Sequence, residues 1–274
     1  MLTIDCAGWA MQLLPSGAIY LPDVATLLVA DAHFGKAVSF RLAGVPVPQG
    51  TTTETLQRLS SALEQTRSLG LDDSGDSSSR PGAIHVIFLG DFLHSAKAHA
   101  APTQQAIASW RAKHPELALT LVRGNHDDRA GDPPAALGVQ VVDEPLMLTG
   151  RAADLAGDAA PLPNAATPLL NAATPLLNVP TPLVNVVTPL ALCHHPQIVP
   201  GAYVLAGHAH PCVVLTGAGR DRLRLPCFWL GDAAKNPVGV LPAFGSFTGM
   251  HPIDRRPRDR VFAVAGDSVR EIPN

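Results

Sequence analysis

Five stretches of the chain share one hydrophobic pattern, a short apolar run that ends in polar residues or glycine. Runs of roughly five to seven apolar residues are typical of strands buried on both faces. The five stretches are VATLLVADAH from Val24, AIHVIFLGD from Ala83, LALTLVRGNHD from Leu117, TPLALCHHP from Thr188 and YVLAGHAH from Tyr203. Helical patterns lie between the early stretches, so we expect a layered α/β fold with ligands gathered at the carboxyl ends of the strands.

Two helices are expected between the first three strands. Leu56, Leu59 and Leu63 recur at spacings of three and four, and a Thr-x-x-Glu capping pattern begins at Thr51. This helix should therefore start near Thr51 and end by residue 70. A second helix is expected over 102–113, before a proline at 115.

One segment departs from this plan. From Asn164 the chain reads NAATPLL, NAATPLL, NVPTPLV and NVVTPLA. A proline in every repeat removes a helical hydrogen bond each time, which excludes a coiled coil, and units of this length are too short for solenoid layers. We interpret 151–187 as a low-complexity insertion, and 1–274 as a single domain that contains it.

Composition narrows the class of protein. Charged residues make up 16% of the chain, against roughly 25% in average soluble domains. No apolar run approaches the roughly 18 residues of a membrane span, and the first residues lack the pattern of a signal peptide. We therefore expect a cytoplasmic protein. The formal net charge of −3 provides no overall basic field for nucleic acid, and the four cysteines show no CxxC spacing, so buried thiols are expected.

The ends of the five predicted strands are rich in potential metal ligands. Seven of the eleven histidines lie there, together with carboxylates and an amide. Imidazoles combined with hard oxygen ligands, without thiolates, suit Mn, Fe or Zn ions. The residues are Asp31, His33, Asp91, His94, Asn125, His126, Asp127, His194, His195, His208 and His210.

The order of these motifs resembles that of the calcineurin-like metallophosphoesterases. The motifs are Asp-x-His at 31–33, Gly-Asp at 90–91, Gly-Asn-His-Asp at 124–127, His194, and Gly-His-x-His at 207–210. The resemblance implies a four-layer α/β/β/α sandwich, with two mixed sheets flanked by helices. It also implies two adjacent divalent metal ions, with Mn expected and Fe or Zn as alternatives, and hydrolysis of phosphoesters by water activated between them.

The resemblance assigns seven ligands in two sets that share a carboxylate. Asp31, His33 and His210 would hold the first metal, Asn125, His194 and His208 the second, and Asp91 would bridge both. His195 is the alternative to His194, because adjacent side chains of an extended strand point in different directions.

Further roles follow from the same resemblance. His126 would contact the phosphate or protonate the leaving group, with Asp127 orienting its imidazole. His94 occupies a position where the family usually has an aspartate. We expect His94 to orient another ligand or to meet the substrate.

Nearly the whole chain outside the insertion resembles the bacterial ligase-associated DNA damage response endonuclease group (PdeM). The matching segments are 31–41, 44–48, 90–95, 225–230 and 241–252. The resemblance implies a DNA endonuclease or phosphodiesterase in DNA repair, with ligase, helicase and exonuclease-like partners.

The residues themselves leave the substrate open. Lys36 and Arg41 beside the first motif, with eight basic against four acidic residues over 220–260, could guide phosphates or form a solvated basic surface. A phosphoesterase for nucleotides or other small molecules, and a scaffold in a repair assembly, are the alternatives.

Overall fold

The computed structural model describes residues 1–47, 50–69, 82–149, 187–217, 219 and 221–273. The polar segment at 71–82 and the insertion predicted over 151–187 lie outside the described residues, apart from Gly82 and Val187.

The first sheet has seven strands in the order of the sequence. Strands β1 to β4 pair antiparallel, and β4 to β7 pair parallel. The strands are β1 (Leu2–Cys6), β2 (Trp9–Leu13), β3 (Ile19–Leu21), β4 (Thr26–Ala30), β5 (His85–Leu89), β6 (Ala118–Val122) and β7 (Val139–Val142).

The second sheet has nine strands and is also mixed. Its main order is β14-β11-β12-β13-β10-β9-β8, and β15 joins β12 to β16. The strands are β8 (Leu146–Leu148), β9 (Leu190–Cys193), β10 (Tyr203–Ala206), β11 (Pro211–Thr216), β12 (Arg222–Leu230), β13 (Val238–Val240), β14 (His251–Pro252), β15 (Arg260–Ala265) and β16 (Ser268–Ile272).

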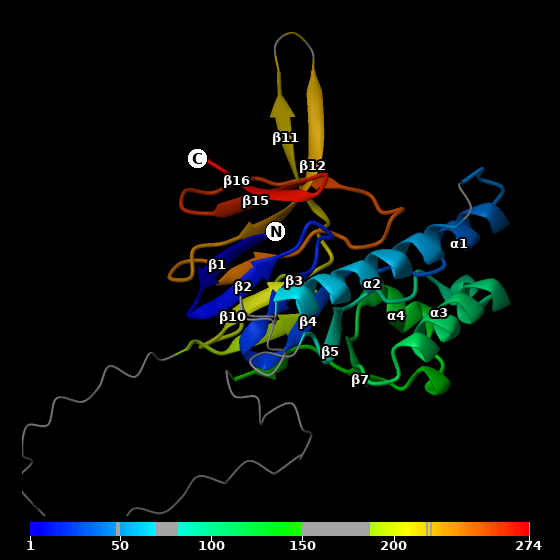
Figure 1. Ribbon diagram of the computed structural model, residues 1–274. Coiled ribbons are helices and arrows are strands. Elements are labelled where there is room, and N and C mark those ends of the chain that lie inside the picture. Colours follow the sequence, from blue (N-terminus) through cyan, green and yellow to red (C-terminus); the bar gives the residue numbers. More distant parts are fainter. Residues whose placement is uncertain (48–49, 70–81, 150–186, 218, 220, 274) are drawn as a thin grey trace, which may run out of the picture.

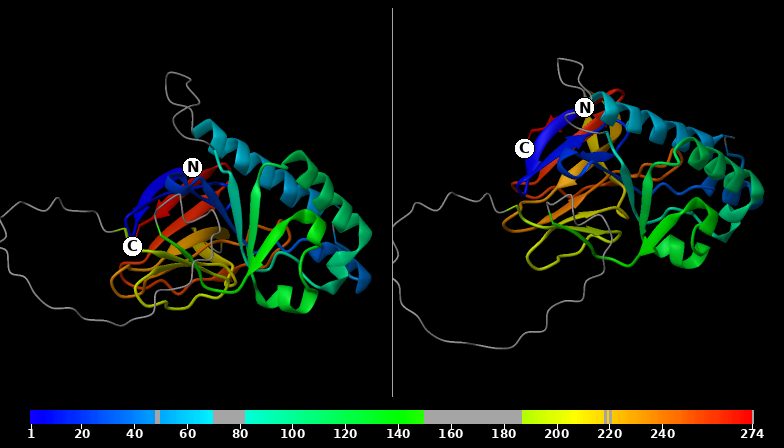
Figure 2. Two further views of the ribbon diagram at one scale, coloured as in Figure 1. Left: turned by 90° about the horizontal axis from the view of Figure 1, so that it is seen from below. Right: turned by 60° about the horizontal axis from the view of Figure 1, so that its bottom comes forward.

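The described α-helices gather on one side of the sheets, as both views of Figure 2 show. They are α1 (Lys36–Leu42), α2 (Thr51–Leu69), α3 (Ala101–Lys113) and α4 (Asn125–Ala130). Short 3-10 turns occur at Pro22–Val24, Ala96–His99 and Ala135–Leu137. The helices predicted at 51–70 and 102–113 are thus confirmed. None of the described helices combines the length and apolar character that a bilayer crossing requires.

Two apolar cores hold the layers together. Leu59 and Leu63 of α2 and Trp110 of α3 pack on one face of the first sheet, against residues such as Phe88. The other face of that sheet packs on the second sheet, where Ile87 shares a core with residues such as Leu192, Leu205 and Phe228. Burial on both faces explains why these strands are apolar almost throughout.

The α/β sandwich expected from the sequence is confirmed. All helices of the described residues precede Val139, and the α-helices form the layer on the first sheet. After Leu137 the described residues form strands and loops. On the second sheet, Val199 and Ala202 of the loop after β9 pack on the small side chains Ala191, Val204 and Ala206. A loop therefore covers part of the face on which a second helical layer was expected.

Candidate metal centre

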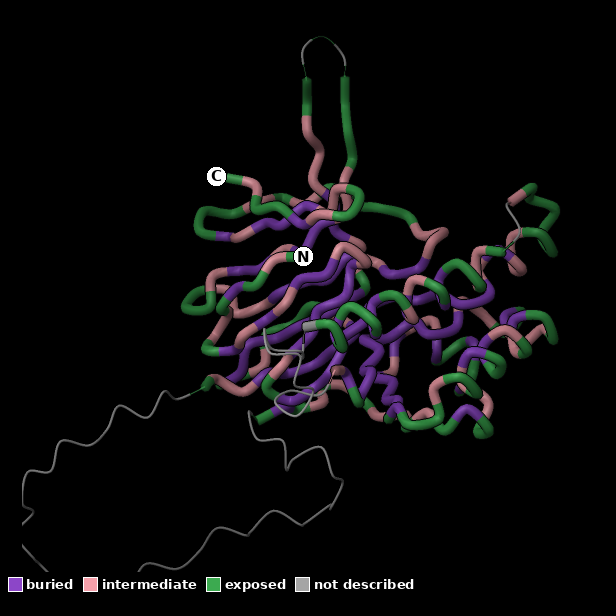
Figure 3. Tube along the Cα trace, viewed as in Figure 1, coloured by how far each residue is buried: buried purple, intermediate pink, exposed green. Residues whose placement is uncertain are grey.

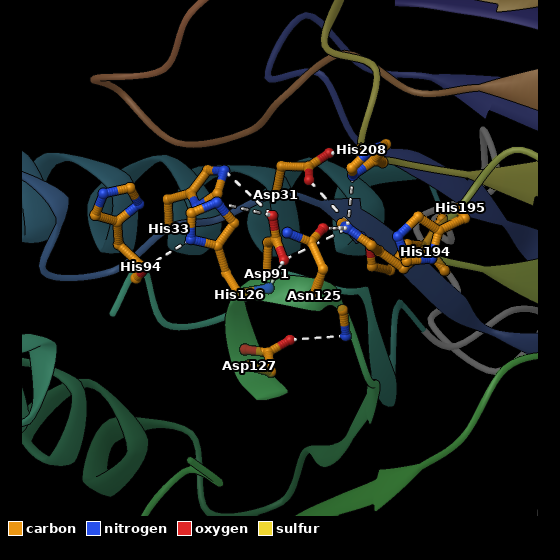
Figure 4. A network of polar contacts seen from close by, with 12 residues as sticks. Asp31, His33, Asp91, His94, Asn125, His126, Asp127, His194, His195 and His208 are labelled. Carbon is orange, nitrogen blue, oxygen red and sulfur yellow. Dashed lines mark hydrogen bonds and ion pairs between the residues drawn. The ribbon is translucent and has the colours of Figure 1, made fainter. Parts of the chain in front are cut away.

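The polar residues predicted at the strand ends come together in one cluster (Figure 4). They come from both sheets, at the carboxyl ends of three parallel strands of the first and two of the second. Asp31 and His33 follow β4, Asp91 and His94 follow β5, Asn125, His126 and Asp127 begin α4 after β6, His194 and His195 follow β9, and His208 and His210 follow β10.

The backbone of this cluster is unusual. Eight described residues other than glycine have a positive φ, and five of them are predicted metal ligands. Such conformations cost of order 1–3 kcal/mol each and are concentrated at functional sites. The five are Asp31 (φ 53°), His33 (46°), Asp91 (52°), His208 (65°) and His210 (46°).

Two glycines allow the segments to approach one another closely. A Cβ on Gly90, which has a φ of 77°, would lie 2.0 Å from Nδ1 of His194. A Cβ on Gly207 would lie 2.6 Å from Oδ2 of Asp31. Glycine at these positions of the Gly-Asp and Gly-His-x-His motifs is therefore required by the packing of the cluster.

Asp91 lies between the two halves of the cluster and is 2% exposed. Its Oδ2 is 3.6 Å from Nε2 of His33, and its Oδ1 is 3.4 Å from Nε2 of His194. The backbone N–H of His126 donates to the same Oδ1 at 2.9 Å. The two carboxylate oxygens thus face different sets of predicted ligands, which is the arrangement expected for a bridging residue.

Asp31 belongs to the first predicted set and lies close to both of its histidines. Its Oδ1 is 3.4 Å from Nε2 of His210, and that nitrogen is 3.4 Å from Nε2 of His33. The backbone N–H of His208 donates to Oδ2 of Asp31 at 2.9 Å, which fixes the carboxylate. The structure therefore brings Asp31, His33 and His210 together.

The second predicted set surrounds the buried ring of His194. Nε2 of His194 is 2.9 Å from Oδ1 of Asn125 and 3.1 Å from Nδ1 of His208. Nδ1 of His194 is 3.1 Å from the carbonyl oxygen of Leu89, which suits an N–H donor on that nitrogen. His194 rather than His195 points into the cluster, and Asn125, His194 and His208 converge.

The cluster has the chemistry of a cation site. Asp31, Asp91, His33 and His194 are all buried, and Oδ1 of Asp31 and Nδ1 of His33 have no hydrogen-bond partner. Burial lowers the pKa of His33, with Lys36 and His210 acting in the same direction, so its imidazole stays neutral and available as a ligand. Because buried carboxylates need compensating charge, these groups could hold metal ions.

His126 is held next to the cluster by His94. Its Nδ1 is 2.6 Å from the backbone oxygen of His94, to which it donates, and the two rings stack with centroids 4.8 Å apart. Nε2 of His126 consequently faces Asp91, 3.9 Å from Oδ2. The His94 ring also contacts His33 edge-on at 5.3 Å, and burial lowers its pKa to about 4.

The role expected for Asp127 is wrong in this structure. Its carboxylate accepts hydrogen bonds from the backbone N–H groups of Leu93 and Gly124, at 3.2 and 3.0 Å. The Nδ1 of His126 is instead bonded to His94. Asp127 therefore joins the start of α4 to the loop after β5, and burial raises its pKa to about 6.

Lys36 is the first residue of α1 and lies close to His33. It lines a polar cavity with His33 and with hydroxyl-bearing residues that include Thr52, Thr55 and Ser246. Burial lowers the pKa of Lys36, and the charges of Asp31 and Asp91 act in the opposite direction. Lys36 thus shares a cavity with the predicted ligand His33, whereas Arg41 lies farther along α1 on an exposed surface.

Glu144 is a further residue of this region that no motif indicated. One oxygen accepts hydrogen bonds from the backbone N–H groups of His194 and His195, at 2.7 and 2.9 Å, and the other is 2.8 Å from Nδ1 of His195. Although burial acts against it, these hydrogen bonds keep the pKa of Glu144 below its usual value. The His195 ring is turned to the open side, 42% exposed, with its centroid 4.6 Å from that of His208.

Comparisons with known proteins place the chain beside a nuclease. No family model and no curated protein matches it. Among solved structures, the Pseudomonas putida nuclease MPE is 35% identical, with a TM-score of 0.68 and 99% of each chain covered. A protein of unknown function from Aquifex aeolicus, AQ665, has 14% identity and a TM-score of 0.33, over 68% of this chain and 77% of its own. With 35% identity over almost the full length of both chains, the chain belongs to the family of the Pseudomonas putida nuclease MPE.

Proposed function

We propose that the chain is a two-metal-dependent nuclease that hydrolyses phosphodiester bonds, with DNA as its substrate. The observation that supports this most strongly is the convergence of seven predicted ligands from both sheets into one cluster, in which Asp31, Asp91, His33 and His194 are buried. The relationship to a nuclease supports the choice of a phosphodiester substrate. We also assign the chain to the calcineurin-like metallophosphoesterases, and propose that it acts in DNA repair as an endonuclease.

The proposed ligand sets are those expected from the sequence. Asp31, His33 and His210 would hold one ion and Asn125, His194 and His208 the other, and Asp91, whose two oxygens face different histidines, would be shared by both sets. Four imidazoles with carboxylate and amide oxygens suit Mn²⁺, with Fe or Zn as the other candidates. Two bound cations supply Lewis-acid activation of water and neutralise charge on the phosphate.

The remaining residues of the cluster act on the substrate. His126 keeps one proton on Nδ1, in its bond to the His94 carbonyl, so Nε2 is the atom that can pass a proton to the leaving oxygen. Lys36 lines a cavity with His33 and would contact the non-bridging phosphate oxygens. His195 lies at the open edge, where the chain flanking the scissile phosphate would pass.

A comparison of three substrates tests the proposal. With Mn²⁺ added, the chain should hydrolyse bis(p-nitrophenyl) phosphate and circular single-stranded DNA, and act slowly on p-nitrophenyl phosphate. Rapid cleavage of the monoester with intact DNA would replace this proposal by a small-molecule phosphoesterase. Metal content measured on the same preparation would identify the ion.

A further inference from the structure

The second sheet extends into a two-stranded arm that stands clear of the body (Figure 1). The arm consists of β11 and the first half of β12, Arg222–Pro226, and its described part excludes residues 218 and 220. It is closed by a hydrogen bond from the N–H of Gly217 to the carbonyl of Asp221. Beyond this half, β12 continues into the body, where it pairs with β13 and β15.

The arm begins at the metal centre. Pro211, its first residue, directly follows the proposed ligand His210, and β14 pairs with β11 at the base. Figure 3 shows that exposure increases from this base towards the tip. A two-stranded ribbon on its own is marginally stable in water, so a projecting arm calls for a functional explanation.

The register divides the side chains of the arm between two faces. Arg224 stands opposite Val214, and Arg222 opposite Thr216. Both arginines therefore lie on one face, because side chains two residues apart in a strand point the same way. The opposite face has aliphatic pairs, Val213 with Leu225 and Leu215 with Leu223.

Arg222 and Arg224 differ from other arginines of the basic segment predicted over 220–260. Arg255 donates to backbone oxygens of Ile272 and Pro273, and Arg260 forms an ion pair with Glu271 at 2.8 Å. Within the described residues, Arg222 and Arg224 are exposed and have no acidic or hydrogen-bonding partner. Their charges are therefore available to an external anion.

We propose that the arginine face of the arm binds the phosphates of a polynucleotide whose scissile bond lies in the metal centre. This inference rests on the proposed nuclease function and names the surface that makes the substrate a polymer. Arg224 and Arg222 are paired with residues four and six positions beyond His210, or about 13 and 20 Å along the strand. Phosphates recur about every 3.4 Å along each strand of a duplex, so the arm covers about six nucleotides at that spacing.

The spacing and charge favour nucleic acid over a protein partner. A ribbon of two strands fits the grooves and backbone of nucleic acid, and arginine is the side chain best suited to paired phosphate contacts. The aliphatic face has one strongly exposed residue, Leu223, at 55%. Binding of a protein through that face is the competing outcome of the test below.

The test compares Arg222→Ala/Arg224→Ala with the wild-type chain. Affinity for a labelled 30-nucleotide single strand is measured by fluorescence anisotropy in EDTA, between 50 and 200 mM salt. Loss of two phosphate contacts should reduce the slope of log K against log salt by about 1.4 for a single strand, or about 1.8 for a duplex. Over this fourfold range the wild type should lose about sevenfold more affinity for single strands than the variant does.

Two controls separate the arm from other effects. Lys113→Ala/Arg270→Ala removes the same charge from α3 and from β16, and should leave the slope unchanged. Hydrolysis of bis(p-nitrophenyl) phosphate with Mn²⁺ should be the same in wild type and arm variant, since this small diester does not reach the arm.

The outcomes distinguish this inference from the proposed function. A wild type that hydrolyses neither diester nor DNA would refute the nuclease proposal. If the wild type cleaves both substrates but the arm variant has the same salt slope as the wild type, the inference about the arm is wrong and the nuclease proposal stands. The same conclusion follows if the arm variant loses hydrolysis of bis(p-nitrophenyl) phosphate as much as it loses affinity for DNA. If Leu223→Ser changes the sedimentation of the chain while the arginine variant changes neither sedimentation nor DNA affinity, the arm is a protein interface and the inference is wrong.

Discussion

The two sheets contribute different chemistry to the candidate metal centre. The first sheet supplies the proposed oxygen ligands Asp31, Asp91 and Asn125 with one imidazole, His33, from strands covered by helices. The second sheet supplies imidazoles, His194, His208 and His210. On that side the carboxylate of Glu144 bonds to the backbone of β9's end instead of pointing into the cluster.

This difference shows that neither sheet contains a complete site. Each proposed ligand set takes residues from both sheets, so the site exists only where the two sheets pack together. Mutations in the first ligand set, in the second ligand set and at Asp91, which both sets share, should therefore differ in their effects on metal binding and hydrolysis.

The largest effect is expected at Asp91, which faces both halves. Asp91→Asn removes the charge between the two proposed ligand sets, so the variant should lose its bound metal. Its rate of diester hydrolysis should fall to the rate that the wild type shows in EDTA. Metal content by mass spectrometry, alongside turnover, checks this. Wild-type turnover in the variant would contradict the bridging role.

His126 should affect the reaction without affecting the metals. His126→Ala removes the Nε2 proton donor but no proposed ligand, so hydrolysis should slow by about 10²- to 10⁴-fold with the metal content unchanged. The effect should be smaller for a diester with a p-nitrophenolate leaving group, which needs less protonation. Loss of metal in this variant would assign His126 to the ligands instead.

Mutation of Glu144 tests how the end of β9, which carries His194 and His195, is held in place. Glu144→Ala removes the acceptor for the N–H groups of His194 and His195, and should weaken Mn²⁺ binding by about 10- to 100-fold. Glu144→Gln keeps an oxygen for these groups and should bind Mn²⁺ nearly as well as the wild type. Calorimetric titration with Mn²⁺ measures both.

A control for Glu144 is available on the same sheet. Glu271→Ala removes a glutamate that pairs with Arg260 away from the cluster, and should leave Mn²⁺ affinity unchanged. Equal affinities of Glu144→Ala and the wild type would show that β9's end needs no such support.

The smallest effect is expected at His85, a histidine at the start of β5 outside the cluster. It is buried and its Nε2 is 2.8 Å from Oγ1 of Thr120, and burial lowers its pKa. The unfolded chain takes up a proton below about pH 6.5 that the folded ring does not, so stability falls as pH falls, by up to about 1.4 kcal/mol per pH unit.

The variant His85→Gln removes this titration. Its free energy of unfolding, from urea denaturation in EDTA at pH 5 to 7, should depend less on pH below 6.5 than that of the wild type. Parallel curves would show that His85 does not contribute to acid sensitivity.

Much of the fold and the candidate site was predictable from local sequence. The apolar runs ending in Asp31, Asp91 and Asn125 are strands β4, β5 and β6, because burial on both faces requires continuous apolar residues. The motifs at their ends predicted which residue types gather. The close approach at Gly90 and Gly207 explains why glycine precedes Asp91 and His208 in those motifs.

The sequence by itself therefore determined the strands, their polar ends and the kinds of ligand available. Only the tertiary structure decided that Nε2 of His33 lies 3.4 Å from Nε2 of His210, although these residues are 177 positions apart in the sequence. It also decided that His194 rather than His195 points into the cluster. The tertiary structure also shows that the backbone carbonyl of His94 orients the His126 ring, and that the carboxylate of Glu144 holds the backbone at the end of β9. These contacts depend on the packing of two sheets, and residues far apart in sequence leave no local periodicity by which they can be recognised.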